Sequence, residues 1–340
     1  MKETVSKKIL VTGASGFVGS FLVEGALDRE MQVWAGIRKS SSRRYLQDPR
    51  IQFAVLDFAH LDTLKQQLVQ HREEHGGWDY IIHCAGVTKC RDKEEFDKGN
   101  YQATRNLVDA LRELEMTPQQ FIYISSLSVF GPIHEETYQP ISEQDEPRPN
   151  TAYGQSKQKS ERYLQSLADF PYVIFRPTGV YGPREKDYFL MAKSIWQHVD
   201  FAAGWKRQDL TFIYVKDLVQ AVYLALEKKV NHRAYFVSDG QVYDSKAFSN
   251  LIRSELGNPW LVRIKCPLLL LRLISFVAEH VAQLMGKTST LNGDKYQIMK
   301  QRNWQCDISP LIQELGYHAE YPLERGVKEI IAWYKKEGWL

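Results

Sequence analysis

A strand-like run that passes through a glycine-rich loop into a helical pattern is the strongest constraint in this sequence. Residues 8–11 (Lys-Ile-Leu-Val) predict a buried strand, and Phe17–Leu27 has the spacing of a helix. The loop Gly13-Ala14-Ser15-Gly16-Phe17-Val18-Gly19 supplies glycine where a chain must turn sharply, approach a phosphate and pack a helix on a strand. Unpaired N–H groups at the start of that helix favour a pyrophosphate. The pattern predicts a dinucleotide-binding loop, with a tight turn that binds nothing as the alternative.

Short apolar runs alternate with longer helical patterns through the first two-thirds of the chain. Further strands are predicted at Met31–Ile37, Ile51–Leu56, Tyr80–His83, Phe121–Ser125 and Tyr172–Phe175. This alternation predicts an α/β fold with a doubly wound parallel sheet. After Pro177 the rhythm changes, and from Tyr243 onward helical patterns dominate. We therefore predict a Rossmann domain over residues 1–180, rejoined by 210–238, and a smaller, mainly helical substrate domain over 181–209 and 239–340.

Composition and charge exclude several other classes of protein. The chain has 340 residues with 44 Lys and Arg against 41 Asp and Glu, so its formal net charge of +3 gives no footprint for nucleic acid. The four cysteines form no CxxC pair and the nine histidines show no ligand spacing, which predicts no metal site. No apolar segment precedes the first strand, so we expect no signal peptide and a cytoplasmic protein.

The most hydrophobic stretch covers residues 267–278 and reads PLLLLRLISFVA. It is too short to span a bilayer and Arg272 interrupts it, so no transmembrane segment is predicted. The stretch is typical of a core helix in the second domain. A wall of the substrate pocket and a weak peripheral contact with a membrane are the alternatives.

The end of the second predicted strand indicates which nucleotide the loop binds. An NAD site places a carboxylate there to bind the ribose 2′-hydroxyl, but this strand ends in Gly36-Ile37-Arg38 and is followed by further cations. We predict NADP(H), with Arg38 as the leading contact to the 2′-phosphate, and leave NAD(H) open. A solvated basic loop is the alternative for Arg38. Asp57, after the third strand, is predicted to contact the adenine or to cap the next helix.

A Tyr and a Lys four residues apart form the candidate catalytic pair. Tyr153 and Lys157 share one face of a predicted helix. A Tyr hydroxyl has a pKa near ~10 and exchanges protons poorly at neutral pH, and a nearby ammonium lowers that pKa. Ser126, at the end of a strand, could polarise a carbonyl or orient an alcohol. A helix face with an ordinary salt bridge and a strand-end cap are the structural alternatives.

The chain resembles the extended branch of the short-chain dehydrogenase/reductase superfamily, also described as the NAD-dependent epimerase/dehydratase family. The matching segments, in the family's order, are TGASGFVG (12–19), HCAG (83–86), NYQATRNL (100–107), YISSLSVFG (123–131), YGQSK (153–157), RPTGVYGP (176–183) and IYVKDL (213–218). The resemblance implies Tyr153 as general acid/base, Lys157 as the residue that holds the nicotinamide ribose and lowers the Tyr pKa, and Ser126 as a hydrogen-bond partner of the reacting oxygen. The cofactor-binding residues expected are Gly13, Ser15, Gly16, Phe17, Val18, Gly19, Arg38, Asp57, Phe58, Ala85, Gly86, Asn100, Ser125, Tyr153, Lys157, Pro177, Gly179 and Val180.

Departures from the family's patterns narrow the reaction. Dehydratases of this group usually follow the catalytic hydroxyl residue with Asp-Glu, whereas Leu127-Ser128 stands here. Nucleotide-sugar epimerases commonly carry phosphate-binding Asn and Arg where this chain has Gly179 and Leu210. A looser resemblance of the C-terminal part, which includes LNGDK (291–295), is to the dihydroflavonol-reductase-like and 3β-hydroxysteroid-dehydrogenase-like subgroup. It implies an apolar ketone or alcohol. Tyr188, Trp196, Phe201 and Trp205 lie where the substrate domain should face the cofactor, and they either line the substrate pocket or fill the core.

The sequence therefore predicts an NADP(H)-dependent oxidoreductase that transfers a hydride between nicotinamide and a ketone or secondary alcohol. A nucleotide-sugar 4-epimerase with the same three residues is the main alternative. A non-catalytic protein that senses NADP is a further alternative. The expected partner is a small-molecule substrate, and the resemblance also allows a homodimer.

Overall fold

The computed structural model describes residues 6–90, 92–285, 289 and 291–340, and its internal contacts divide the chain into two compact units. Unit 1 comprises Met1–Ser126, Ser156–Arg176 and Val219–Tyr235. Unit 2 comprises Leu127–Gln155, Pro177–Leu218 and Phe236–Leu340. The predicted Rossmann domain over residues 1–180 includes residues 127–155, which these contacts assign to unit 2. The predicted domain boundary at residue 180 stays a prediction.

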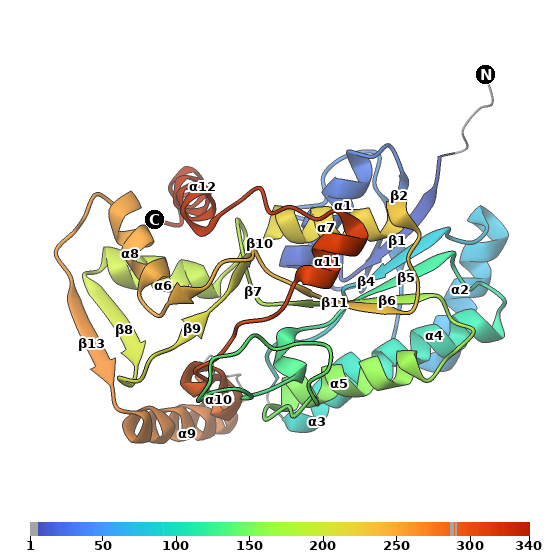
Figure 1. Cartoon of the computed structure of the whole chain (residues 1–340). Helices are drawn as coiled ribbons and strands as arrows, with labels where there is room; N and C mark the ends of the chain where they lie inside the picture. The colour runs from blue at the N-terminus through green and yellow to red at the C-terminus, as the bar shows by residue number, and fades with distance from the viewer. Residues whose placement is uncertain (1–5, 91, 286–288, 290) are drawn as a thin grey trace. The chain divides into compact units, whose positions relative to one another are not determined.

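Unit 1 is built on the seven-stranded sheet, in the order β11-β6-β5-β4-β1-β2-β3 (Figure 1). Its strands are β1 (Lys8–Thr12), β2 (Gln32–Ile37), β3 (Gln52–Val55), β4 (Tyr80–His83), β5 (Gln120–Ile124), β6 (Tyr172–Pro177) and β11 (Arg233–Val237). The ladders between β6 and β3 are all parallel. The order reverses between β1 and β4, so the carboxyl ends of these two strands flank the crevice where such sheets bind ligands. The predicted doubly wound parallel sheet is confirmed.

Helices cover both faces of this sheet. They are α1 (Phe17–Leu27), α2 (Leu61–His75), α3 (Lys93–Phe96), the π-helical turn η1 (Asp97–Gln102), α4 (Ala103–Glu113), α5 (Ala152–Gln165) and α7 (Val215–Lys228). One face packs α2, α4 and α5 on the strands through a buried cluster that includes Leu64, Leu107 and Leu164. On the other face α1 lies against α7, and a Cβ at Gly25 would come within 2.6 Å of Val219 (Figure 1). Continuous apolar strands are required because both faces are buried.

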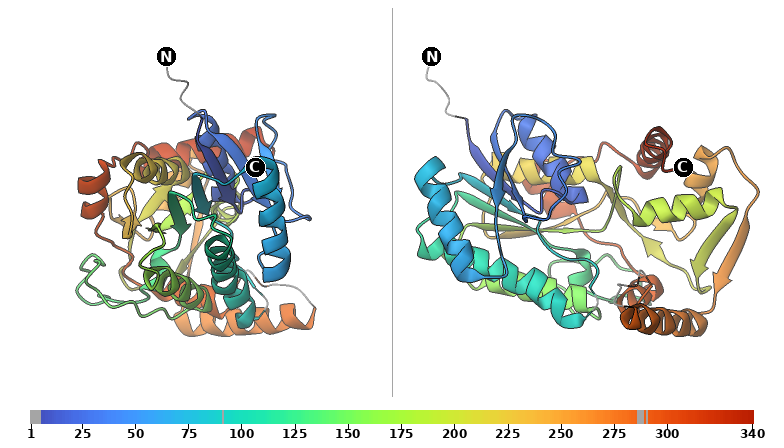
Figure 2. Two further views of the ribbon diagram at one scale, coloured as in Figure 1. Left: turned by 90° about the vertical axis from the view of Figure 1, so that its right-hand side faces the viewer. Right: turned by 180° about the vertical axis from the view of Figure 1, so that it is seen from behind.

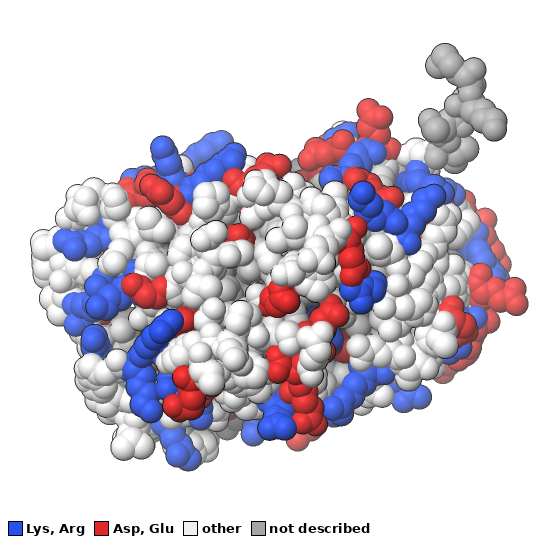
Figure 3. Space-filling model, in the orientation of Figure 1, with Lys and Arg blue, Asp and Glu red and all other residues white. Residues whose placement is uncertain are grey.

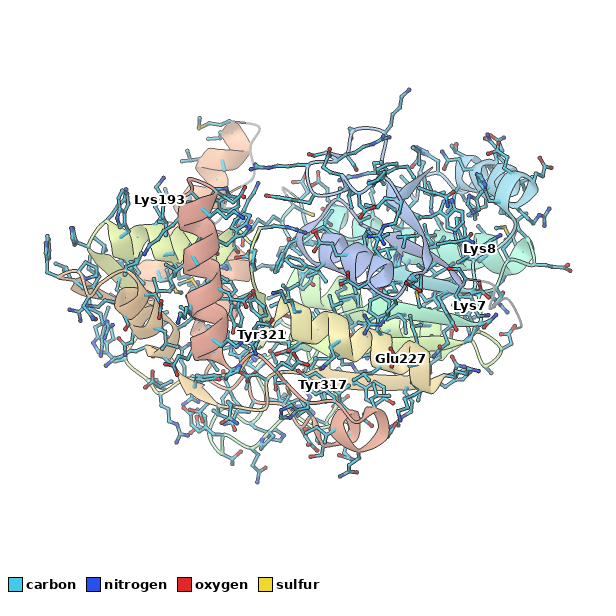
Figure 4. All side chains as sticks on the ribbon, turned by 90° about the horizontal axis from the view of Figure 1, so that it is seen from above. Lys7, Lys8, Lys193, Glu227, Tyr317 and Tyr321 are labelled. Carbon is cyan, nitrogen blue, oxygen red and sulfur yellow. The ribbon has the colours of Figure 1, made fainter. Side chains whose placement is uncertain are left out.

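Two lysines anchor the first strand of this sheet. These residues are Lys7 and Lys8, labelled in Figure 4. Lys7 Nζ pairs with Asp79 Oδ1 at 2.8 Å, and Lys8 Nζ donates to the carbonyl of His75. The backbone N–H of Lys8 also donates to Asp79, at 2.9 Å. These contacts fix the start of β1 against the segment that leads into β4, so they help to set the register of the strand that carries the glycine loop.

Unit 2 combines three two-stranded sheets with six α-helices and a 3-10 turn within its described residues. The strands are β7 (Gly179–Tyr181), β8 (Val199–Ala203), β9 (Asp209–Leu210), β10 (Phe212–Tyr214), β12 (Tyr243–Asp244) and β13 (Val262–Cys266). The helices are α6 (Asp187–Trp196), α8 (Ala247–Glu255), α9 (Leu268–Leu284), α10 (Gly293–Lys300), α11 (Ser309–Leu315) and α12 (Leu323–Lys336), with η2 (Leu127–Val129) as the 3-10 turn. Helical patterns dominate after Tyr243 as expected, and two short strands, β12 and β13, also form there and pair with β9 and β8.

The core of unit 2 is rich in aromatic side chains. Tyr321, labelled in Figure 4, stacks on Tyr214 with ring centroids 4.5 Å apart. The hydroxyl of Tyr214 donates to Glu329 Oε2, with 2.6 Å between the two oxygens. Both rings belong to a buried cluster shared by α6, α8 and α12. Among the described residues, no helix is both long and apolar enough to cross a membrane.

Candidate active site

The glycine loop leaves the end of β1 in a conformation that only small residues permit. Gly13 has φ +67°, and a Cβ on it would lie 2.8 Å from the backbone of Ala85. A Cβ on Gly19 would come within 2.1 Å of the carbonyl oxygen of Gly13, so the first turn of α1 packs directly on the loop. Gly16 is the N-cap of α1, and that helix has no acidic residue in its first turn. The loop therefore offers free backbone space and an uncompensated positive helix end, which fits a pyrophosphate.

A buried chain of hydrogen bonds connects this loop to the neighbouring strand. Thr104 Oγ1 donates to the carbonyl of Asn100, at 2.7 Å, and so accepts from His83 Nε2, at 3.1 Å. The other ring nitrogen of His83 lies 2.8 Å from Thr12 Oγ1, which also accepts from the backbone N–H of Ala85. The chain is satisfied when Thr12 donates to His83 Nδ1, so it selects a neutral His83 protonated at Nε2.

Burial lowers the pKa of His83 to about 3, and the nearby charge of Lys157 lowers it further. An unfolded His titrates near ~6.5, so between these values the unfolded chain binds a proton that the folded chain does not. The stability contributed by neutral His83 is therefore complete above ~6.5 and is lost as the pH falls toward 3. As the pH is lowered through this range, the free energy of unfolding should fall more steeply for the wild type than for His83→Gln. The expected difference in slope is up to about 1.4 kcal/mol per pH unit. Urea unfolding at a series of pH values measures this difference, with the exposed His318→Gln as control. Equal pH slopes for the wild type and His83→Gln would refute a buried neutral His83.

Asn100 fastens the loop after β4 to the catalytic helix. Its amide Nδ2 donates to Ser156 Oγ at 2.8 Å and to the carbonyl of Val87 at 3.1 Å, and its Oδ1 accepts from the N–H of Val87. A Cβ on Gly86 would lie 2.7 Å from Asn100 Oδ1 and 3.5 Å from Lys157 Nζ. Asn100 is fully buried within a π-helical turn, a local distortion often found at functional sites. The structure thus brings Ala85, Gly86, Asn100 and Lys157 together beside the glycine loop.

Lys157 is held at the end of β5. Its Nζ donates to the carbonyl of Ile124 at 2.8 Å and lies 4.6 Å from the centre of the Tyr123 ring. The residue is 5% exposed, so the ammonium has little freedom. Ile124 directly precedes Ser125 and the half-buried Ser126. One hydrogen bond therefore fixes the ammonium to the strand end from which Ser126 follows.

Tyr153 lies in the first turn of α5, one turn before Lys157 on the same helix. The backbone N–H groups of Ala152 and Tyr153 each donate to the Asp294 carboxylate at 3.1 Å. Asp294 lies in the first turn of α10, 141 residues beyond Tyr153, and it caps the turn that carries this side chain. A Cβ on Gly154 would lie 2.4 Å from the carbonyl oxygen of Ser128, so the turn also packs closely on η2. Sequence reasoning missed Asp294, whose only signal was its place in the LNGDK segment.

A buried ion pair lies behind the strand end. Arg176 donates to Glu161 at 2.7 Å, and the two side chains are 7% and 3% exposed. Glu161 also accepts from the hydroxyl of Ser125. The side chain of Ser125 is thus committed to this network, and its predicted role toward a cofactor would fall to its backbone. Sequence reasoning did not identify the Glu161–Arg176 pair, because the two residues come from a helix and a strand with no shared motif.

The ends of β2 and β3 carry the residues predicted for the adenosine half of the cofactor. Arg38 is exposed, and its backbone N–H donates to Ser41 Oγ at 3.0 Å in the turn after β2. Asp57 accepts from the N–H of Ala59 and pairs with His60 at 2.8 Å. The hydrogen bond with the His60 side chain is the largest cause that lowers the pKa of Asp57. Asp57 therefore shapes the turn into α2. The half-buried Phe58 packs edge-on against His83.

Unit 2 holds the remaining predicted positions. Pro177 is buried at the end of β6, and Gly179 and Val180 lie in β7. A Cβ on Gly179 would lie 2.5 Å from the hydroxyl oxygen of Tyr188, whose ring stacks on Phe248 with centroids 4.7 Å apart. Of the four aromatics expected near a substrate, only Tyr188 belongs to this cluster. The others are more than half exposed, namely Trp196, Phe201 and Trp205.

Metal binding and a cysteine nucleophile are the other kinds of chemistry to consider. The described residues contain no group of three His, Cys, Asp or Glu side chains that could hold a metal ion. Burial raises the pKa of the Cys84 thiol to about 11, so this sulfur is not a thiolate at neutral pH.

The comparisons with known proteins agree with this geometry. Residues 9–238 match the family described as NAD dependent epimerase/dehydratase. The UDP-glucose 4-epimerase of Vibrio cholerae is 26% identical over 95% of this chain and 94% of its own length. The sterol-4-alpha-carboxylate 3-dehydrogenase (decarboxylating) of Dictyostelium discoideum is 24% identical over 86% of this chain and 94% of its own length. The crystal structure of dTDP-glucose 4,6-dehydratase from Bacillus anthracis in complex with NAD has a TM-score of 0.77 at 18% identity, over 98% of each chain, which establishes the shared fold. The chain belongs to the NAD dependent epimerase/dehydratase family, within the extended short-chain dehydrogenase/reductase superfamily.

Proposed function

We propose that this protein is an NADP(H)-dependent oxidoreductase that interconverts an apolar ketone and its secondary alcohol. The observation that carries the proposal is the placement of Lys157. Its ammonium is fixed by the carbonyl of Ile124 and lies 3.5 Å from the Cβ position of Gly86, beside the glycine loop. Tyr153 stands one turn earlier on the same helix, held by Asp294 through the backbone. A buried hydrogen bond thus fixes Lys157, and the half-buried Asp294 fixes the backbone of Tyr153.

The residues divide the chemistry as follows. When bound, the nicotinamide supplies the two-electron exchange with the substrate carbon as a hydride. Tyr153 transfers the proton of the reacting oxygen, and the ammonium of Lys157 favours the phenolate that this transfer requires. Ser126 hydrogen-bonds the same oxygen. Gly13, Gly19 and the backbone of Ala85 and Gly86 leave the space that a dinucleotide needs, and Asn100 keeps that loop in place.

Arg38 is proposed to select NADP(H). The end of β2 presents no carboxylate for a ribose 2′-hydroxyl, and the exposed Arg38 follows it directly. Because a charge-assisted hydrogen bond to a phosphate contributes about 1.5–3 kcal/mol, Arg38→Gln is expected to weaken NADPH binding about tenfold or more. Binding of NADH should stay the same. Fluorescence titration of both cofactors measures this, with the exposed Arg162→Gln as control. Unchanged NADPH affinity in Arg38→Gln would show that this residue does not bind the 2′-phosphate.

Two features support an apolar substrate. The position at which nucleotide-sugar epimerases commonly carry an Asn is Gly179, and the hydroxyl of Tyr188 takes up the space where a side chain would begin. Tyr188 belongs to an aromatic cluster with Tyr181, Phe212 and Phe248 rather than to a polar pocket. Leu127, where decarboxylases and dehydratases carry an acid, is 1% exposed and part of the core. A nucleotide-sugar 4-epimerase is the second candidate, and the 26% identity to the Vibrio cholerae enzyme favours it.

Cofactor consumption separates the two candidates. The purified protein is incubated with NADPH and a panel of apolar ketones, such as steroid and flavonoid ketones, and in parallel with UDP-glucose. A reductase oxidises NADPH in proportion to the alcohol formed. An epimerase converts UDP-glucose to its 4-epimer with no net change in NADPH. Conversion of UDP-glucose without turnover of any ketone would overturn the proposed function.

A further inference from the structure

Helix α9 has a broad exposed apolar face, and within unit 2 the ribbon shows no other described element over the outer side of this helix (Figures 1 and 2). Its outward side chains are 43–88% exposed and comprise Leu269, Leu270, Leu273, Ile274, Phe276, Val277, Val281 and Leu284. At 3.6 residues per turn these positions occupy roughly 160° of the helix circumference. The opposite stripe, with Leu271 and Ser275, is buried against unit 2. A surface helix normally turns its apolar stripe inward, so this outward face calls for a partner.

Apolar residues continue at the N-terminal end of this helix. β13 leads into α9, and it exposes Val262 and Ile264 on alternate positions. Trp205 is 63% exposed and follows Gly204, where a Cβ would meet Leu268 at 3.3 Å. An exposed Trp beside the first turn of an apolar helix is typical of a protein surface that meets the interfacial region of a bilayer.

A pocket opens at one border of the apolar face. It lies between α9 and α10, has a volume of about 300 Å³ and is lined in part by Arg272, Glu279, Tyr296 and Lys300. Arg272 is exposed and forms no ion pair or side-chain hydrogen bond with any other residue that the structure describes. The carboxylate of Glu279 accepts from the backbone N–H of Gly293 at 2.9 Å. Two cations thus flank a pocket whose one carboxylate already has a partner, which suits a phosphate group.

The charge of this region differs from that of the whole chain. Residues 260–300 contain six Lys and Arg against two Asp and Glu, whereas the entire chain has 44 against 41. Arg263 and Lys295 pair with Asp200 and Asp187. Among the described residues of this segment, Lys265, Arg272 and Lys300 are the cations without an ion pair. Figure 3 shows Lys and Arg side chains beside uncharged surface in the region of β13 and α9. The apolar face is therefore bordered by positive charge, which matches an anionic surface.

We propose that α9 docks the protein on an anionic membrane surface, with the helix in the plane of the interface. The apolar arc would enter the boundary between headgroups and acyl chains, and the pocket with Arg272 and Lys300 would take a lipid phosphate. A second copy of the chain fits less well. In a two-fold symmetric dimer each patch faces itself, so Arg272 and Lys300 at the border of one patch would meet the same cations of the second copy and repel them.

The test is co-sedimentation of the purified full chain with vesicles of phosphatidylcholine and phosphatidylglycerol, or of phosphatidylcholine alone. The wild type is expected to bind the anionic vesicles and to be released by high salt. Ile274→Glu, which places a carboxylate in the apolar arc, should lower the partition coefficient about tenfold or more. Arg272→Gln should lower it about fivefold. Vesicle binding is measured without cofactor or substrate, so its outcome does not depend on the proposed reaction.

Two matched variants serve as controls. Ile312→Glu adds the same charge at an isoleucine of α11 that is 47% exposed, against 43% for Ile274. Lys328→Gln removes an exposed cation from α12. Neither should change binding to vesicles. The proposal is overturned if the wild type binds neither vesicle, or if Ile274→Glu binds as well as Ile312→Glu. It is also overturned if the wild type without lipid is a dimer that Ile274→Glu converts to a monomer, because the face would then be a self-interface.

Discussion

Replacing Tyr153 by Phe is expected to lower kcat by about a hundredfold or more on any ketone that the wild type reduces. The change removes the one hydroxyl proposed to move a proton and leaves the aromatic ring in place. The capping of the helix by Asp294 uses backbone N–H groups, so it survives the substitution. NADPH binding and the unfolding transition should therefore match those of the wild type, as measured by fluorescence titration and urea unfolding.

Tyr163→Phe is the matched control for this variant, because it makes the same change on the same helix. The hydroxyl of Tyr163 bonds to Asp109 and has no part in the proposed chemistry. We expect its kcat to stay within about twofold of the wild type, with at most a loss of about 1 kcal/mol in stability from the missing hydrogen bond. Activity of Tyr153→Phe close to that of Tyr163→Phe would refute the role of Tyr153.

The second large effect concerns the buried pair behind the active-site strand. Arg176→Leu should lower the free energy of unfolding by about 3–5 kcal/mol, because it leaves the Glu161 carboxylate buried without its counter-charge. The pair is almost fully shielded from water, at 7% and 3% exposure, so solvent cannot replace the lost partner. Urea unfolding followed by circular dichroism measures the change.

An exposed ion pair provides the comparison. Arg148 and Glu146 lie 2.8 Å apart with side chains 72% and 73% exposed, and Arg148→Leu should change stability by less than about 1 kcal/mol. The double variant Glu161→Leu with Arg176→Leu should recover much of the loss, since it removes both charges. A double variant as unstable as Arg176→Leu alone would show that packing, and not the unpaired carboxylate, determines the loss.

Local sequence determined most of what could be predicted. The glycine loop was recognisable because Gly13, Gly16 and Gly19 each meet a constraint set within a few residues of their own position: a positive φ, a helix cap and a close approach to the loop backbone. The parallel sheet followed from strands buried on both faces. The sequence placed Asn100 in the cofactor region only through a family resemblance. Its clamp between Val87 and Ser156 is a product of tertiary packing.

The features that sequence missed depend on contacts between distant residues. Asp294 caps the turn of Tyr153 from 141 residues away, and no spacing rule connects the two positions. Glu161 and Arg176 become a pair only when α5 packs behind β6. The composition of the apolar segment 267–278 predicts a core helix, but it does not reveal which side of the helix other elements cover. In the structure, Leu271 is buried while Leu269 is 80% exposed.

Isotope transfer tests the proposed function most directly. The protein is incubated with NADPH that carries deuterium at the hydride position, together with the apolar ketone that it turns over fastest, and the product is examined by mass spectrometry and NMR. A reductase yields an alcohol with one deuterium on the carbinol carbon and an equal amount of NADP⁺. Unlabelled product with no NADP⁺, or conversion of UDP-glucose to its 4-epimer as the only reaction found, would contradict a reductase that acts through Tyr153.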